Sequence, residues 1–243
     1  PTGEPMKVGV SIADLMSGMY AAVAILAAVR HQGATGMGQH LDISMLDAHV
    51  AWLANQGMNY LATSENPARL GNQHPNIVPY QVMPSNDGYF VLSVGNDPTF
   101  ERFCEAAEAL ELLEDPKFAT AVERVRNRDE VTARLNEITR AHSTDWWVER
   151  LEANKVGCGR INSLEDTFND PQVKAREMVI DMPHPATEGR DARLIASPLK
   201  LSETPVSYRR PPPMLGEHTD EVLEEFLDLD AGARAALRDE GII

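Results

Sequence analysis

Cysteine is scarce in this sequence of 243 residues. Cys104 and Cys158 stand far apart and form no CxxC pair. A disulfide-stabilised fold and a structural zinc site both need more cysteines than this, so we interpret the two as free thiols in a reducing cytoplasm. The histidines are scattered without the spacing of metal ligands, which predicts that the protein has no metal site.

Basic residues are also few. The chain has 22 Lys and Arg against 37 Asp and Glu, which gives a net charge of −15 at pH 7. A chain this acidic repels the phosphate backbone of a nucleic acid unless its basic residues form a concentrated patch, and the sequence shows no such patch. We therefore expect no nucleic-acid partner.

Long apolar runs are missing as well. The longest run, from Gly18 to Val29, has twelve residues, whereas a membrane-spanning helix needs about 20. The run predicts a buried helix and no membrane partner. Residues 1–7 do not have the basic and apolar regions of a signal peptide, and Pro1 is not an initiator residue. We expect a cytoplasmic chain that begins inside a longer protein.

The first 60 residues are instead notable for their low charge. They hold six charged side chains, against 53 in the other 183 residues, which predicts a segment buried on most sides. Its apolar patterns alternate between those typical of strands, at residues 8–12 and 39–45, and those typical of helices, at residues 14–31 and 46–60. A glycine-rich turn at residues 33–38 separates the first helix from the second strand. The order strand, helix, strand, helix predicts an α/β fold.

A loop rich in Pro and Asn, residues 66–79, is the predicted domain boundary. Beyond it, Tyr80–Met83 and Tyr89–Val94 flank an Asp-Gly pair, which is typical of a β-hairpin because this pair tolerates positive φ. The rest predicts two more strands and several helices. The strands are residues 178–182 and 194–199, and the helices are residues 98–110, 123–141, 144–154, 163–168, 219–228 and 231–239.

Asp14 is a lone carboxylate between an apolar run and a helix of small residues. The residues alone leave two interpretations open. An acid in the first turn stabilises a helix through the helix dipole. Alternatively, the free N–H groups of the helix start would hold an ionised carboxylate, and Gly18, one turn on, would leave space for a substrate above it. Asp14 could then act as a covalent nucleophile.

The loop that follows the first segment carries a second candidate site. Gly71 precedes three polar side chains in a row, Asn72, Gln73 and His74. Such a segment can be an exposed connector between domains. It can also be a lid, in which glycine gives mobility and the amides and the imidazole donate hydrogen bonds to a bound carboxylate.

Motifs along the whole chain resemble those of the family III CoA-transferases. They are Met6–Gly18, Thr35–Gln39 with Asp42–Asp47, Gly71–Tyr80, Asp87–Gly88, Gly95–Asp97 and Pro211–Thr219. Within the family, the sequence is most similar to members that use dicarboxylates, such as succinyl-CoA–glutarate CoA-transferases. The resemblance covers the C-terminal part of a family member, so we expect the N-terminal half, which makes most of the family's CoA contacts, to be missing from this chain.

The resemblance implies the fold of that family. This is an α/β fold with a large α/β domain built from both chain ends and a small α+β domain between them, in an interlocked homodimer. On this chain, residues 1–60 would belong to the large domain and carry the nucleophile. Residues 61–185 would form the small domain, and residues 186–243 would return to the large one.

The resemblance also implies the chemistry. The family's nucleophilic aspartate matches Asp14, which would attack an acyl-CoA thioester, form an aspartyl-CoA intermediate and pass CoA to a carboxylic acid. The family's lid matches Gly71–His74, where His74 adds a cation for a second carboxylate. Succinyl-CoA or a similar acyl-CoA would be the donor, and a dicarboxylate the acceptor. Coenzyme A would be a substrate, with no permanently bound cofactor.

Two alternatives stay open. In the related α-methylacyl-CoA racemases, the matching aspartate transfers a proton opposite a histidine. In the other alternative, this chain alone is a non-catalytic fragment or a binding partner of another protein.

Overall fold

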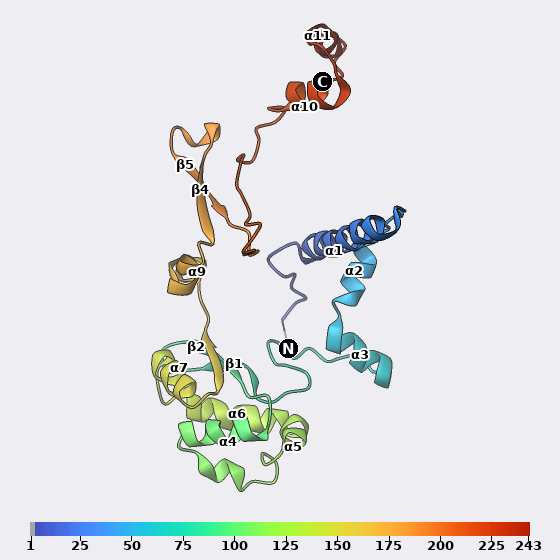
Figure 1. Cartoon of the computed structure of the whole chain (residues 1–243). Helices are drawn as coiled ribbons and strands as arrows, with labels where there is room; N and C mark the ends of the chain where they lie inside the picture. Colours follow the sequence, from blue (N-terminus) through green and yellow to red (C-terminus); the bar gives the residue numbers. More distant parts are fainter. Residues whose placement is uncertain (1–2) are drawn as a thin grey trace. The chain divides into compact units, whose positions relative to one another are not determined.

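The computed structural model describes residues 3–243. The chain divides into two compact units, residues 1–161 and 162–243, which Figure 1 shows coloured along the sequence. The domain division expected from the family resemblance, with boundaries after residues 60 and 185, stays a prediction.

Residues 3–63 form three helices and no strand. The helices are α1 (Ile12–Thr35), α2 (Met45–Ala51) and α3 (Ala54–Thr63). The predicted helix at residues 14–31 is confirmed, and the chain leaves it at Gly36, whose φ of 75° is left-handed. The single helix predicted over residues 46–60 is wrong, because the chain breaks before Ala54, which has a φ of 47°.

The strands predicted at residues 8–12 and 39–45 are wrong. A strand needs a neighbour to satisfy its backbone N–H and C=O groups. Neither segment pairs with another part of residues 3–243, where the ladders join only β1 to β2, β2 to β3 and β4 to β5. An alternating pattern shows that a segment suits a sheet, but the pairing partner must come from elsewhere.

Helix α1 is exposed within the described chain. None of its residues is buried, and among residues 3–63 only Ala48 is buried. The prediction of a buried helix is therefore wrong for residues 3–243. The twelve-residue apolar run is too short for a membrane span, but the whole of α1 is long and apolar enough to cross a membrane, a test that core helices of soluble proteins also pass. The absence of a membrane partner stays a prediction.

A three-stranded antiparallel sheet begins after the loop. Its strands are β1 (Tyr80–Pro84), β2 (Tyr89–Ser93) and β3 (Gly157–Arg160), in that order across the sheet. The predicted hairpin is confirmed, with Tyr80 opposite Ser93. Strand β3 is missing from the sequence-based prediction, because its two glycines give no strand pattern. Its backbone forms a strand because it pairs with β2.

The hairpin turn is fixed to a distant helix. Asp87 Oδ1 accepts hydrogen bonds from the backbone N–H of Thr144 at 2.8 Å and from the hydroxyl of Ser85 at 2.9 Å. These bonds, the one from Thr144 foremost, hold the pKa of Asp87 below its usual value. The turn therefore stays joined to the start of the helix that follows residue 143.

Helices pack on this sheet and enclose the main core. They are α4 (Asp97–Ala106), the 3-10 helix η1 (Leu110–Leu113), α5 (Ala121–Arg126), α6 (Arg128–Thr139) and α7 (Thr144–Ala153). Helix α6 contacts β1, and α7 contacts β2 and β3. The largest apolar side chains of the core, Trp147, Phe90, Phe100, Phe103 and Met83, are fully buried. The side chain of Ser143 caps α7 by accepting the Trp146 N–H. The helix predicted over residues 123–141 is interrupted at Asn127.

Residues 162–243 form a second unit of short elements. They are α8 (Leu164–Asn169), α9 (Pro171–Ala175), β4 (Val179–Pro183), the 3-10 helix η2 (Pro185–Thr187), β5 (Asp191–Ile195), α10 (Thr219–Leu227) and α11 (Ala231–Asp239). The predicted helices in this part are confirmed. The strand predicted at residues 194–199 lies earlier, because the register with β4 runs from Pro183 opposite Asp191 to Val179 opposite Ile195.

Candidate active site

Asp14 lies in the first turn of α1, as the third helical residue after Ser11. It is exposed, and no hydrogen bond or ion pair within residues 3–243 engages its carboxylate. Ser11 does not cap the helix with its side chain. At the start of α2, by contrast, Ser44 accepts a hydrogen bond from the Asp47 N–H at 3.2 Å. The N–H groups of Ile12 and Leu15 donate to the carbonyls of Val10 and Ser11. The N–H groups of Ala13 and Asp14 and the Asp14 carboxylate therefore stay available to a ligand.

The surface beside Asp14 is open. A Cβ atom added at Gly18 would meet no atom within 4 Å. The hydroxyl of Ser17 donates to the carbonyl of Ala13 at 2.7 Å, so it is engaged within the helix. The space predicted above the carboxylate is thus present among the described residues.

The loop that carries Gly71–His74 is fixed to the first strand. Gly71 has a φ of 64°, which is left-handed. Asn72 Oδ1 accepts the N–H of Val82 at 3.0 Å, and the N–H of His74 donates to the carbonyl of Tyr80 at 2.9 Å. The rings of His74 and Tyr80 stack with their centroids 5.3 Å apart.

Two arginines from helices that follow the hairpin hold the end of this loop. Arg128 donates to the carbonyls of His74 at 2.9 Å and Pro75 at 2.7 Å. Arg124 donates to the carbonyl of Val78 at 3.0 Å. Burial lowers the pKa of Arg128, but an arginine keeps its charge in proteins. Sequence reasoning missed both residues, because a basic residue in a helix is usually a surface charge.

Three of the four predicted loop residues meet in one hollow of about 300 Å³. We call it the loop hollow; its walls include Gly71, Asn72 and Gln73 with Gln81 of β1 and Thr132, Asn136 and Arg140 of α6 and its C-terminal end. The side chains of His74 and Asp14 are not among its lining residues. The structure therefore brings the loop together with a cation that the sequence did not indicate, and places the His74 ring against Tyr80 instead.

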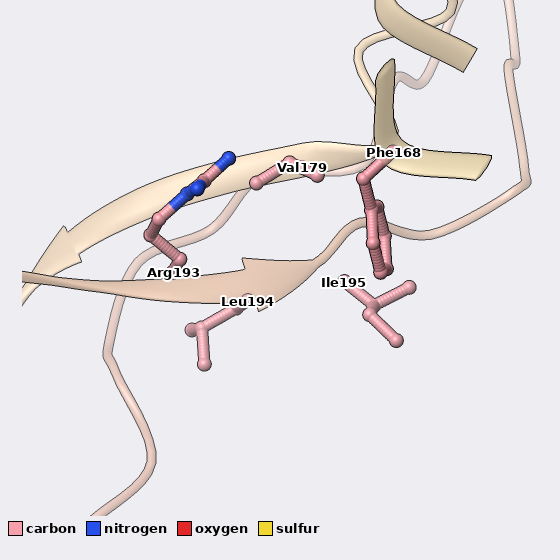
Figure 2. A pocket seen from close by; sticks show the side chains of 5 residues that line it. All are labelled: Phe168, Val179, Arg193, Leu194 and Ile195. Atoms are coloured by element: carbon pink, nitrogen blue, oxygen red, sulfur yellow. The ribbon is translucent and has the colours of Figure 1, made fainter. Parts of the chain in front are cut away.

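Other hollows and nucleophiles in the described residues suit this chemistry less. A small hollow of about 210 Å³ is lined by residues of β4, β5 and α8. Figure 2 shows its lining side chains, among which Phe168, Val179 and Ile195 are apolar. Burial raises the pKa of the Cys104 thiol to about 12, so the thiolate needed for nucleophilic attack is not formed at neutral pH. Residues 3–243 also contain no group of three His, Cys, Asp or Glu side chains arranged to hold a metal ion.

The sequence model of CoA-transferase family III matches residues 1–219. The chain belongs to this family. It is 42% identical over 233 residues to the succinate–glutarate CoA-transferase of Agrobacterium fabrum, covering 96% of this chain and 58% of the relative. It is 35% identical over 242 residues to the human succinyl-CoA:glutarate CoA-transferase, covering 99% of this chain and 55% of the relative.

Solved structures of family III proteins show the same fold. A CAIB/BAIF family protein from Brucella suis superposes with a TM-score of 0.72 at 39% identity, over 93% of this chain and 58% of that one. The resemblance drawn from the motifs is therefore confirmed, together with the family's α/β fold. The chain spans little more than half the length of these family III proteins.

Proposed function

We propose that this protein transfers CoA from an acyl-CoA to a carboxylic acid, with Asp14 as the covalent nucleophile. The observation that carries the proposal is the exposed, unengaged Asp14 carboxylate in the first turn of α1, beside the open surface at Gly18. Family membership supports the reaction class, and the relatives named above act on succinate and glutarate. We therefore assign a dicarboxylic acyl-CoA, such as succinyl-CoA, as the donor and a dicarboxylate as the acceptor.

Each half of the reaction consists of two acyl transfers. The Asp14 carboxylate attacks the thioester carbonyl of the donor, which gives a mixed anhydride and releases CoA thiolate. The thiolate then attacks the Asp14 carbonyl, so that the donor acid leaves and an aspartyl-CoA thioester remains. The acceptor carboxylate attacks this thioester, which gives a second mixed anhydride and releases CoA thiolate. The thiolate then attacks the acceptor's carbonyl in this anhydride and leaves with it as the product acyl-CoA. Asp14 returns as a carboxylate, and coenzyme A enters and leaves as part of the substrates.

The free N–H groups of the α1 start would favour the ionised form of Asp14 between cycles. Water must stay away from the anhydride, because hydrolysis would release the acyl group without transferring CoA. We propose that the loop Gly71–His74 contributes to this exclusion and binds the acceptor carboxylates. Since His74 Nδ1 accepts the Asn76 N–H at 3.1 Å, the proton of the neutral ring lies on Nε2, where it can be donated to a carboxylate.

The assay that tests this function mixes full-length protein with succinyl-CoA and glutarate and follows glutaryl-CoA by chromatography. We expect glutaryl-CoA to form without exchange of the substrate α-protons in deuterated water. Exchange of the α-proton without CoA transfer would identify a racemase and contradict the proposal.

His74→Ala should raise the acceptor KM about tenfold and the donor KM much less. The reason is the loss of one hydrogen bond from Nε2 to a charged acceptor, which is worth about 1.5–3 kcal/mol. The measurement is steady-state kinetics with glutarate and with a monocarboxylate of similar length. His142→Ala is the matched control, because this exposed histidine stacks on Trp146 and does not line the loop hollow. Equal losses with both acceptors would show that His74 does not contact a second carboxylate.

The helices of residues 3–63 have an apolar surface that another part of the protein must cover. Leu26 of α1 is 70% exposed and Leu61 of α3 is 74% exposed. An uncovered patch of this kind marks an interaction surface. We propose that the remainder of a polypeptide of the relatives' length covers it, in an interlocked homodimer of cytoplasmic protein, so that α1 faces protein rather than lipid.

The isolated 243 residues should therefore aggregate or form large oligomers and transfer no CoA. Each large apolar side chain left bare forgoes roughly 1.5–3 kcal/mol. Size-exclusion chromatography with light scattering should show the oligomers, and supplying the remainder of the protein should restore a dimer and activity. Leu26→Lys should reduce aggregation of the isolated chain, whereas Leu164→Lys, 78% exposed on α8, should not. A stable monomer that transfers CoA alone would contradict the expectation.

A further inference from the structure

A buried amide in the loop hollow is not explained by the fold. Gln81 is 5% exposed and shares the core-facing side of β1 with Met83, where a strand is expected to carry apolar residues. The hydroxyl of Thr132 donates to Gln81 Oε1 at a long 3.5 Å, and the amide nitrogen is not among the described side-chain atoms that are buried without a partner. Because Gln81 lines the loop hollow, this nitrogen can donate to a ligand there.

Two further groups of the same hollow are also without partners in the described chain. Asn136 Oδ1 is buried without a hydrogen bond, and turning this amide by 180° would place an N–H donor there instead. Arg140, directly after α6, makes no ion pair within residues 3–243. Thr132, Asn136 and Arg140 are spaced four residues apart, so they follow one face of α6. A guanidinium and two side-chain amides thus line one hollow.

We propose that the loop hollow binds the carboxylate of a small organic acid. The Arg140 guanidinium would supply the charge and two parallel N–H donors, which match the two oxygens of a carboxylate. The amides of Gln81 and Asn136 would donate to the remaining lone pairs. A hollow of about 300 Å³ has room for a dicarboxylic acid of the size of glutarate.

The choice of a dicarboxylate rests on the proposed function. The carboxylate can come from two sources, the free acid or the free end of a dicarboxylic acyl group on CoA. Both present the same group to Arg140, so the experiment needs one arm for each source.

The first arm titrates the full-length protein with sodium glutarate by calorimetry, without acyl-CoA and hence without turnover. We expect saturable binding of glutarate and none of glutaramide, its neutral counterpart. Arg140→Gln should weaken glutarate binding at least tenfold, which is about 1.4 kcal/mol. Arg134→Gln is the matched control on the same helix, where Arg134 pairs with Glu111 at 3.2 Å and Glu137 at 3.1 Å; it should bind glutarate as the wild type does.

The second arm uses succinyl-CoA and butyryl-CoA with Asp14→Ala protein, which cannot turn them over. If the acyl group is the source, Arg140→Gln should weaken the binding of succinyl-CoA tenfold and leave the binding of butyryl-CoA unchanged. Either arm supports the proposal and identifies the source. Equal affinities of Arg140→Gln and its parent for both glutarate and succinyl-CoA would overturn it.

Gln81→Leu separates ligand binding from a structural role. Leucine belongs on the core-facing side of a strand, so we expect the melting temperature without ligand to stay equal or rise while affinity for the carboxylate falls at least tenfold. A lower melting temperature with unchanged affinity would overturn the role of Gln81. Glutarate binding that depends on Arg140 in a protein without CoA transfer would leave the hollow's role intact and reject the proposed function instead.

Discussion

Asp14→Ala should lower kcat for CoA transfer at least about a thousandfold, because the proposed acyl-enzyme bond forms on the Asp14 carboxylate. The side chain is exposed and makes no contact on which the fold depends. The variant should therefore keep the circular dichroism spectrum and the oligomeric state of the wild type. The measurement is the rate of glutaryl-CoA formation from succinyl-CoA and glutarate under saturating conditions.

Asp47→Ala is the matched control for this substitution. Asp47 holds the same position in α2 that Asp14 holds in α1, the third residue after a serine. Both changes remove a first-turn acid, which costs about 0.3–1 kcal/mol through the helix dipole. Only Asp14→Ala should stop transfer. Transfer near the wild-type rate in Asp14→Ala would remove the covalent mechanism.

Arg124→Met should lower the free energy of unfolding of residues 75–160 by about 3–5 kcal/mol. Arg124 is fully buried. Its guanidinium donates to the carbonyls of Val78 at 3.0 Å and Phe118 at 2.8 Å and to Asp97 Oδ1 at 2.7 Å. Methionine fills similar space but leaves two buried carbonyls without donors and the carboxylate without its cation. Urea unfolding followed by tryptophan fluorescence measures the loss.

Arg126→Met controls for the loss of a positive charge near the same helix end. Arg126 is exposed, and among residues 3–243 it pairs only with Glu123, on its own helix. An exposed pair of this kind contributes at most about 1 kcal/mol. If the two variants unfolded at the same urea concentration, the buried contacts of Arg124, including the one to Val78 at the end of the loop, would not contribute the predicted stability.

Local signals explain why much of the fold could be predicted. The hairpin at residues 80–93 has an Asp-Gly turn between two alternating runs, and α7 begins at a serine cap. Both features depend on residues close in sequence. The strands expected at residues 8–12 and 39–45 depend on partners that no local pattern contains, and they are absent from residues 3–243.

The residues of the candidate site also differ in whether nearby sequence or only tertiary contacts reveal them. Asp14 was open to two interpretations from its neighbours, and the family resemblance favoured the nucleophile. The loop Gly71–His74 was marked by its composition. Arg128 and Arg140 became visible only once α6 lay against the loop and β1. Gln81 is the residue that the sequence could have revealed, because it interrupts the apolar face of a predicted strand.

The most direct test of the covalent mechanism is to identify the residue that carries CoA. Full-length protein is incubated with succinyl-CoA alone and then quenched with hydroxylamine. Hydroxylamine should convert the aspartyl thioester to a hydroxamate. Peptide mass spectrometry should find this modification on Asp14, and it should be absent without acyl-CoA and in Asp14→Ala. Active protein that transfers CoA while Asp14 remains unmodified would contradict the proposed mechanism.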